Sequence, residues 1–513
     1  MTDRRVLLGA IVAVLAAAPR ADAQFYFGQN QVQYDSFDWK VVETDHFLVH
    51  YYPGEETAAR DAARMAERAY GRLSRILGHE FREKKPIVLF ASRSDFGQNN
   101  VTGDLGEFTG GVTEALRHRI LMPFTGDYGS FEQVLTHEMV HEFQYDIYSR
   151  GKAGAGLQTL QQQAMPYWFA EGMAEYLSLG PGDPFANTVM RDAALNGRLP
   201  TIEQLTMRPD QYNPYDIGQA LWEYVGDRWG DEVIGAILQA APNVGVERAF
   251  RRELGKSLED LGDEWKEAMQ VKHLPQIADL ERARKYAQPL LSERRSGGAI
   301  FLAPALSPNG EQIVFLSNGS FLRGQIFIDL WLADARTGKR LKRLVKSTTN
   351  PEFEELRLLY SQSSFSPDGR TLAFTAQRKG KDVLYLLDVR KRKVIRRIDT
   401  YLEGVTGPSW SPDGNRLVFS GHFGGISDLY LADGSHLTQL TNDRHGDLQP
   451  QWSPDGKRIA FASDRGPETD FDVLRYSPWK ISTYDLETGH VEILPGQDGH
   501  NINPMWSPDS RSI

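Results

Sequence analysis

The first half of the chain alternates between short apolar segments and longer amphipathic ones. Residues 39–53 and 86–92 have the apolar or alternating pattern of β-strands, and residues 110–124 predict a further strand at the edge of a small sheet. Between the first two segments, residues 56–78 repeat apolar side chains at helical spacing and end at Gly78, a frequent helix stop. This mixture of strands and helices predicts an α+β domain.

A second amphipathic segment covers residues 126–150. Its apolar side chains recur at helical intervals, at Phe131, Val134, Leu135, Val140, Phe143 and Ile147. Ser130 and Gln133 have the spacing of a capping box, so we expect the helix to begin at Ser130. From there to about Lys285 the pattern remains mostly helical.

Beyond about residue 297 a repeat replaces the helical pattern. A Ser-Pro-Asp-Gly-like motif occurs five times, and an alternating strand follows each of the first four copies. The leading serines are Ser307, Ser366, Ser411, Ser453 and Ser507. The successive spacings of 59, 45, 42 and 54 residues are typical of the blades of a β-propeller. In this motif Pro presets the turn, Gly takes a positive φ, and the strand fills the space between neighbouring blades.

These repeats resemble the propeller of the Tol-system component TolB and its relatives, over residues 295–513. The resemblance implies four-stranded blades that bind proteins or peptides, and it implies no chemistry. Because the sequence stops inside a repeat at Ile513, and because an open propeller would expose strand edges, we expect further blades in a longer product.

The N-terminal segment has the features of a secretory signal. Arg4 and Arg5 precede an apolar run, and Ala21 and Ala23 form an A-x-A cleavage site. A single membrane anchor is the alternative, but the run is short for a span, which needs about 20 apolar residues. The expected divisions are a signal peptide at 1–23, an α+β domain at 24–285, a linker at 286–300 and a truncated propeller at 301–513.

Composition narrows the classes of function. The formal net charge is −10, which argues against a nucleic-acid footprint, and we expect no transmembrane span after signal cleavage. The chain has no cysteine, so neither a disulfide nor a thiolate metal site can form. Any metal must therefore be held by His and carboxylate side chains. The expected location is the bacterial periplasm or the extracellular space.

The segment 126–150 contains His137-Glu138-x-x-His141. Residues four apart lie on one helix face, so the two imidazoles can reach one metal ion. Zinc accepts His nitrogen and leaves one position to water at catalytic sites. Glu138 lies beside the pair without blocking it, where its carboxylate can act as a general base. The alternative is two ordinary polar residues on a half-buried helix, so the assignment depends on a third ligand.

Residues 168–175 supply that third ligand. Glu171 follows Trp168 and Phe169, among apolar side chains where an unpaired carboxylate would be costly. We predict that it binds zinc, one ion per chain, with His137 and His141. Glu175 lies one turn on and is predicted to accept the free N–H of a ligating His.

Together these motifs resemble the gluzincin metallopeptidases of the peptidase-MA-like group, over residues 40–275. Those enzymes combine H-E-x-x-H with a later W-x-x-E-G-x-A motif, here Trp168 to Ala174. The resemblance implies a zincin-like fold, with His137, His141 and Glu171 as ligands and Glu138 as base. Gluzincins also pair substrate backbone with a sheet edge. The G-A-M-E-N segment that aminopeptidases carry at that edge is absent, which favours an endopeptidase.

Relatives commonly add a downstream Tyr or His that stabilises the oxyanion. Tyr215 is the candidate here, with Tyr212 and Tyr224 as rivals, and a packing role at a helix start is the alternative for Tyr215. The zinc would still polarise the carbonyl without such a donor.

The sequence therefore predicts a multidomain, exported zinc peptidase that cleaves peptides or proteins. Its propeller would present or filter substrate, or bind an envelope protein. One alternative is a non-catalytic envelope scaffold that uses the propeller for protein–protein interaction. Another is a serine peptidase with a propeller, like the prolyl oligopeptidases, but no G-x-S-x-G motif occurs in the 513 residues.

Overall fold

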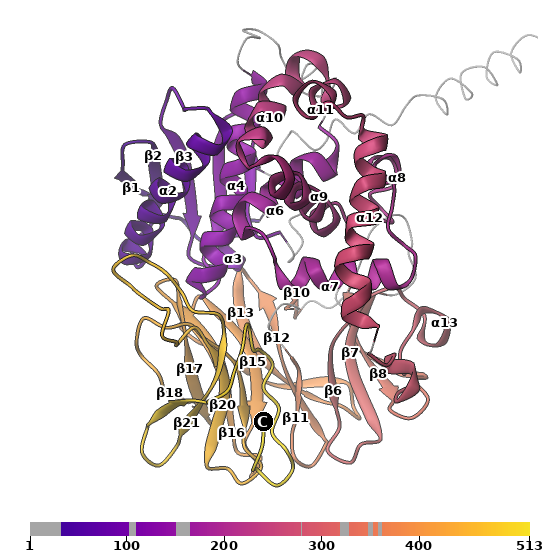
Figure 1. Ribbon diagram of the computed structural model, residues 1–513. Helices are drawn as coiled ribbons and strands as arrows, with labels where there is room; N and C mark the ends of the chain where they lie inside the picture. The colour runs from indigo at the N-terminus through magenta and orange to yellow at the C-terminus, as the bar shows by residue number, and fades with distance from the viewer. Residues whose placement is uncertain are drawn as a thin grey trace, which may run out of the picture.

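A computed structural model describes residues 32–101, 109–149, 165–278, 280–318, 328–346, 352–357 and 362–513. The predicted signal peptide at 1–23 lies outside the described residues. Helices and one small sheet form the first half, and a propeller of four antiparallel blades forms the described second half (Figure 1). Across these described segments, no helix has both the length and the apolar character needed to cross a bilayer.

The small sheet has five strands in the order β1-β2-β3-β5-β4. Strands β2, β3 and β5 run parallel, and the two edge strands β1 and β4 are antiparallel to their neighbours. The bounds are β1 Lys40–Glu43, β2 Phe47–Tyr51, β3 Lys85–Phe90, β4 Val112–Glu114 and β5 Arg119–Pro123.

Two segments predicted as single strands are hairpins. Residues 39–53 form β1 and β2 around a bend at Asp45 and His46. Residues 110–124 form β4 and β5. In this second segment His118 has a φ of 51° and Leu116 is exposed. The chain therefore turns there, which the apolar pattern alone did not reveal.

Two long helices pack against each other beside this sheet. Helix α2 (Glu56–Leu77) ends at Gly78, whose left-handed φ of 60° confirms the predicted stop. Helix α4 (Tyr128–Ser149) begins two residues before the predicted capping box. Asp127 caps it, because its carboxylate accepts bonds from the backbone N–H groups of Gly129 and Ser130. Asp127 directly precedes the helix, whereas Ser130 lies in its first turn and donates its hydroxyl proton to the Asp127 carboxylate.

Helices complete the first half. Of these, α6 and α10 contact α4, and α6 also packs against α9. Their bounds are α3 Arg93–Phe96, α6 Tyr167–Leu179, α7 Pro184–Leu195, α8 Ile202–Met207, α9 Pro214–Trp229, α10 Glu232–Val244, α11 Val246–Leu254 and α12 Leu258–Ile277. A 3₁₀ turn, η2 at Ala283–Lys285, directly precedes the predicted linker, and a short helix, α13 at Glu293–Ser296, lies within it.

The propeller blades are antiparallel sheets, each built from consecutive strands. The bounds in the first two blades are β6 Phe301–Leu306, β7 Gln312–Asn318, β8 Ile328–Asp334, β9 Arg340–Val345, β10 Glu355–Leu356, β11 Ser364–Phe365, β12 Thr371–Arg378, β13 Lys381–Asp388 and β14 Lys393–Ile398. Those in the last two are β15 Gly404–Trp410, β16 Arg416–Phe423, β17 Ile426–Asp433, β18 His436–Gln439, β19 Asp447–Trp452, β20 Arg458–Ser463, β21 Lys480–Asp485 and β22 Val491–Ile493.

The repeated motif forms the same turn in every copy. In the third copy, for example, the Ser411 hydroxyl donates to the Asp413 carboxylate and accepts from the Arg416 backbone N–H at 2.9 Å. Gly414 follows with a φ of 73°, a value that only glycine adopts without strain. The turn precedes strands β7, β12, β16 and β20, which confirms the predicted order of turn and strand, while the fifth copy has Ser510 with a φ of 59° in place of the glycine.

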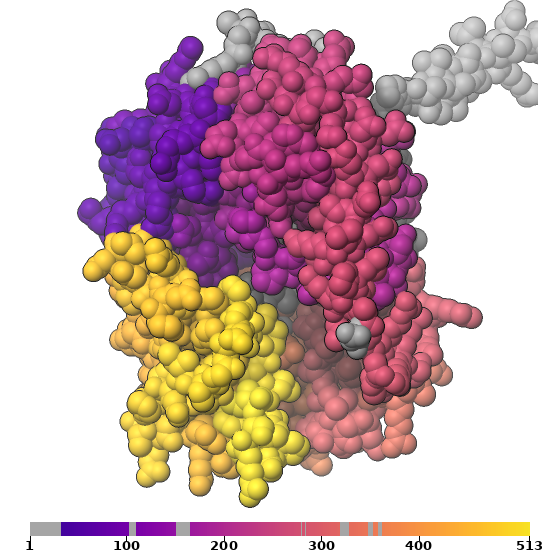
Figure 2. All heavy atoms as spheres, in the orientation of Figure 1, coloured from indigo at the N-terminus to yellow at the C-terminus, as the bar shows by residue number. Residues whose placement is uncertain are grey.

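The two halves contact each other through buried polar and apolar groups. The Arg357 guanidinium of the propeller donates to Asp382 at 2.7 Å, and the Ser94 hydroxyl of α3 donates to the same carboxylate at 2.9 Å. Leu474, from the last blade, belongs to the hydrophobic core of the first half. Figure 2 shows the yellow last blade lying directly against the indigo N-terminal segments. The first half thus rests on the propeller through specific side chains.

Candidate metal centre

His137 and His141 lie one turn apart on the buried face of α4. Both side chains are about nine-tenths buried, and their Nε2 atoms lie 3.1 Å apart. Helical spacing alone brings two such imidazoles together, since residues i and i+4 share one face. The H-E-x-x-H prediction is therefore consistent with the geometry of this helix.

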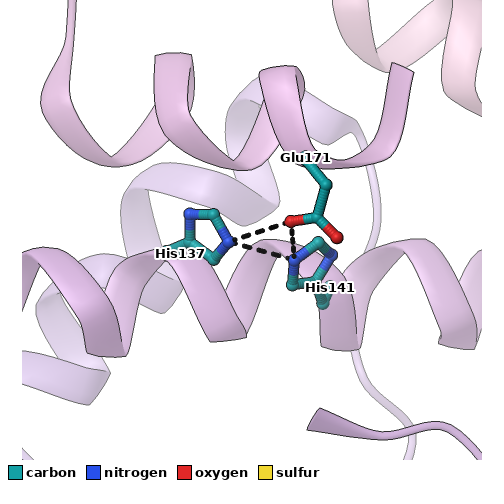
Figure 3. Close-up of side chains that lie close together, drawn as sticks. All are labelled: His137, His141 and Glu171. Atoms are coloured by element: carbon teal, nitrogen blue, oxygen red, sulfur yellow. Dashed lines mark hydrogen bonds and ion pairs between the residues drawn. The ribbon is translucent and has the colours of Figure 1, made fainter. Parts of the chain in front are cut away.

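Glu171 reaches the same point from α6, which crosses above α4. Its Oε2 atom lies 3.1 Å from Nε2 of His141 and 3.4 Å from Nε2 of His137. Figure 3 shows the carboxylate and both rings pointing toward one another from the two helices. The structure thus brings together the three side chains that the sequence analysis assigned as ligands.

This arrangement has the dimensions of a zinc site. Ligands about 2.0–2.1 Å from a tetrahedral zinc ion lie about 3.3–3.4 Å from one another. The three distances between ligand atoms are 3.1, 3.1 and 3.4 Å. Two imidazoles and one carboxylate are also a donor set that zinc uses at catalytic sites. The residues present therefore fit the ion.

A close contact between glycines sets the position of Glu171. A Cβ atom on Gly172 would lie 2.3–2.8 Å from backbone atoms of Gly218 on α9. A Cβ on Gly218 would in turn meet the carbonyl oxygen of Trp168 at 2.6 Å. Only two glycines permit α6 and α9 to approach this closely. The W-x-x-E-G pattern therefore has a packing reason, because the glycine that follows Glu171 admits α9.

The electrostatics of the cluster favour positive charge. Burial alone would lower the pKa of His141, but the Glu171 carboxylate outweighs it and raises that pKa to about 9. Burial would raise the pKa of Glu171, yet hydrogen bonds from His137 and His141 hold it far below its usual range. A divalent cation would take the place of this positive charge.

Two side chains face the outer nitrogens of the histidines. Oε1 of Glu175 lies 3.6 Å from Nδ1 of His137, longer than a hydrogen bond. Burial raises the pKa of Glu175, and Gln133 bonds its other oxygen at 3.3 Å. Oε1 of Gln144 lies 2.9 Å from Nδ1 of His141, so Gln144 fixes the orientation of this ring. The sequence analysis missed Gln144, although its spacing of three residues from His141 places it on the same helix face.

Glu138 is buried beside the cluster, close enough for its charge to raise the pKa of His141. Its Oε2 atom accepts a hydrogen bond of 2.6 Å from the hydroxyl of Thr113 on the edge strand β4. No signal in the sequence identified Thr113, because it lies 25 positions before Glu138 and only the fold brings the two together.

Tyr215 lies at the mouth of the cluster. Its ring stacks on His137 with centroids 6.2 Å apart, while 41% of the residue stays exposed. Burial of the hydroxyl, followed by the nearby Glu171 and Glu138 carboxylates, raises its pKa. Of its rivals, Tyr224 contacts Arg228 at 2.8 Å and Tyr212 packs against the hydrophobic core. Tyr215 is therefore the tyrosine that the structure places beside the predicted ligands.

A second group of acidic and His side chains lies behind α4. His118, Glu142 and Asp146 converge there. The ammonium of Lys85 already contacts Glu142 at 2.8 Å and Asp146 at 2.9 Å. This buried cation bridges the two carboxylates, so the group anchors α4 to β3.

Comparison with known proteins identifies the propeller. Residues 355–477 match the model of the TolB beta propeller domain. The second half carries a TolB-like β-propeller. A comparison with curated proteins gives no match.

Three solved structures are similar to part of this chain. TolB from Acinetobacter baumannii is 27% identical, with a TM-score of 0.34, over 43% of this chain and 49% of that one. A putative TolB from Agrobacterium tumefaciens is 24% identical, with a TM-score of 0.33, over 42% and 73%. A puromycin-hydrolysing peptidase from Mycobacterium tuberculosis is 17% identical, with a TM-score of 0.30, over 40% and 32%. This chain thus spans about half the length of the Acinetobacter TolB.

Proposed function

We propose that this chain is a zinc-dependent peptidase, an endopeptidase of the gluzincin type, with a zincin-like first half. The observation that carries the proposal is the convergence of Nε2 of His137, Nε2 of His141 and Oε2 of Glu171 within 3.4 Å of one another. Glu138 and Tyr215 both adjoin this cluster.

Each residue has a role in hydrolysis of a peptide bond. His137, His141 and Glu171 would hold the ion. When bound, zinc supplies Lewis-acid chemistry, which polarises a carbonyl and makes water more acidic. The Glu138 carboxylate accepts the proton from the attacking water and returns it to the leaving amine. The Tyr215 hydroxyl donates a hydrogen bond to the carbonyl oxygen as negative charge develops there.

The TolB-like propeller supports the second part of the proposal. We assign it a role in binding the protein substrate or an envelope protein, and we place the mature chain in the periplasm or outside the cell. If the first half binds no metal, the alternative function is a non-catalytic scaffold that binds an envelope protein through the propeller. Metal content therefore separates the two functions.

The first test is hydrolysis of an unstructured protein by wild type and by Glu138→Gln. Wild type should contain one zinc ion and cleave, a chelator should abolish cleavage, and added zinc should restore it. Glu138→Gln should keep its zinc but lose activity by about 100- to 10,000-fold, because the base is gone. Full activity in this variant would refute the role of Glu138. If the purified wild-type protein contains no zinc, the proposal of a zinc-dependent peptidase is refuted.

A further inference from the structure

The edge strand β4 lies against the part of α4 that carries Glu138. Gly110 and Gly111 make this approach possible, because a Cβ at Gly110 would meet Val134 at 3.1 Å. A Cβ at Gly111 would lie 2.8 Å from Cγ of Glu138 and 3.1 Å from its Oε1. The missing side chain at residue 111 thus leaves space for the Glu138 carboxylate.

Thr113 uses this approach to hold the carboxylate. Its hydroxyl oxygen lies 2.6 Å from Oε2 of Glu138 and 2.9 Å from the backbone carbonyl oxygen of the same residue. Both partners are acceptors, so the single hydroxyl proton is directed at Glu138 in either case. The shorter contact goes to the carboxylate, and a hydrogen bond to a charged acceptor is the stronger kind.

We propose that Thr113 is a positioning residue for peptide hydrolysis, whose hydroxyl fixes Oε2 of Glu138 and leaves Oε1 to take the proton of the attacking water. The inference rests on the proposed function. A general base must lie within hydrogen-bond reach of the proton it removes, and its orientation affects the rate strongly. A free Glu138 side chain would have several rotamers, whereas the bond to Thr113 selects one.

The test compares Thr113→Val with Thr113→Ser. Valine has the shape of threonine but lacks the hydroxyl, so kcat should fall by about 10- to 100-fold while KM stays within about twofold. Serine keeps the hydroxyl and should restore kcat to within about threefold. Zinc content should match wild type in both variants. A crystal structure of Thr113→Val should show the Glu138 carboxylate displaced from its wild-type position.

Thr136→Val is the matched control. The Thr136 hydroxyl donates to the backbone carbonyl oxygen of Glu132 within α4, not to Glu138. Its loss should leave kcat within about twofold of wild type. Gly111→Ala is an independent second variant, since its methyl group would displace Cγ of Glu138 and lower kcat with Thr113 intact.

The outcomes separate the two proposals. Suppose that wild type hydrolyses peptides but that Thr113→Val has the same kcat as the Thr136→Val control. That result would overturn the role of Thr113 and leave the proposed function intact. A Thr113→Ser variant as slow as Thr113→Val would also overturn it, because the hydroxyl would then be irrelevant. Wild type without metal-dependent hydrolysis would overturn both the proposed function and this inference.

Discussion

At the residue scale, the candidate site depends on how each polar side chain is surrounded. His141 contacts Glu171 through one ring nitrogen and Gln144 through the other. Gln144 itself is anchored, because its amide nitrogen donates to the carbonyl oxygen of Ala170 at 3.0 Å. Ala170, which directly precedes Glu171, thus holds Gln144 in the position from which Gln144 orients His141. Metal affinity should therefore respond to changes at Gln144 as well as at the ligands.

Glu171→Ala should lower zinc affinity and stability together. Loss of a ligand should weaken binding by at least about 100-fold, more than the loss of an outer partner. Since metal binding contributes folding energy, wild type should melt at a higher temperature when zinc is added, and the variant should not. Chelator competition and thermal melting with and without zinc measure both effects. An unchanged zinc stoichiometry would contradict the ligand assignment.

Gln144→Met should reduce zinc affinity by about 10- to 100-fold, because the His141 ring loses its hydrogen-bond acceptor. Chelator competition measures this change. Gln239→Met is the control, since Gln239 bonds the carbonyl oxygen of Leu77, on a different helix. Equal zinc affinities in the two variants would show that Gln144 does not orient His141.

At the element scale, close helix packing builds the site. Helix α6 carries Glu171 and α9 carries Tyr215, and the contact between Gly172 and Gly218 brings these helices together. The edge strand β4 reaches α4 through Gly110 and Gly111 in a similar way. In both places the absence of a side chain determines how near the functional groups lie.

Gly172→Ala should destabilise the protein by about 1–3 kcal/mol, because its methyl group cannot fit against the backbone of Gly218. Urea denaturation measures the loss. Gly71→Ala on α2 is the control, since a Cβ there meets nothing within 4 Å. That change should instead stabilise by up to about 1 kcal/mol through helix propensity. Similar effects at both positions would exclude the packing role of Gly172.

At the scale of the whole molecule, the propeller is joined to the first half by buried polar contacts. Arg357 and Asp382 are both more than nine-tenths buried, and Ser94 of α3 bonds the same carboxylate. Elsewhere Arg444 pairs with Asp61 of α2 at 2.9 Å, and the imidazole Nε2 of His422 lies 3.2 Å from the carbonyl oxygen of Ala91. These contacts join the propeller to α2, α3 and the segment that follows β3.

Arg357→Met should reduce the free energy of unfolding by about 3–5 kcal/mol, because it leaves the buried Asp382 carboxylate without its charged partner. Urea denaturation measures the change. Arg390→Met alters an exposed side chain of the same propeller and should stay within about 0.5 kcal/mol of wild type. A small effect at Arg357 would mean that Asp382 becomes protonated or solvated at little cost.

The sequence by itself determined the local features of this protein. Pattern and spacing were sufficient to predict features that depend on residues at most five positions apart. These features are helix α2 with its stop at Gly78, the pairing of His137 with His141, and the Ser-Pro-Asp-Gly turns. Glu171 was predicted from its resemblance to a motif and from its apolar neighbours, and its role as a zinc ligand stays a prediction.

Only the tertiary structure decided the contacts between distant residues. The approach of Glu171 to the histidines and the contact of Thr113 with Glu138 depend on packing between segments that are 25 or more positions apart. Burial determines these outcomes, because a buried polar group must find a partner wherever the chain supplies one. No local pattern records which distant residue will provide it.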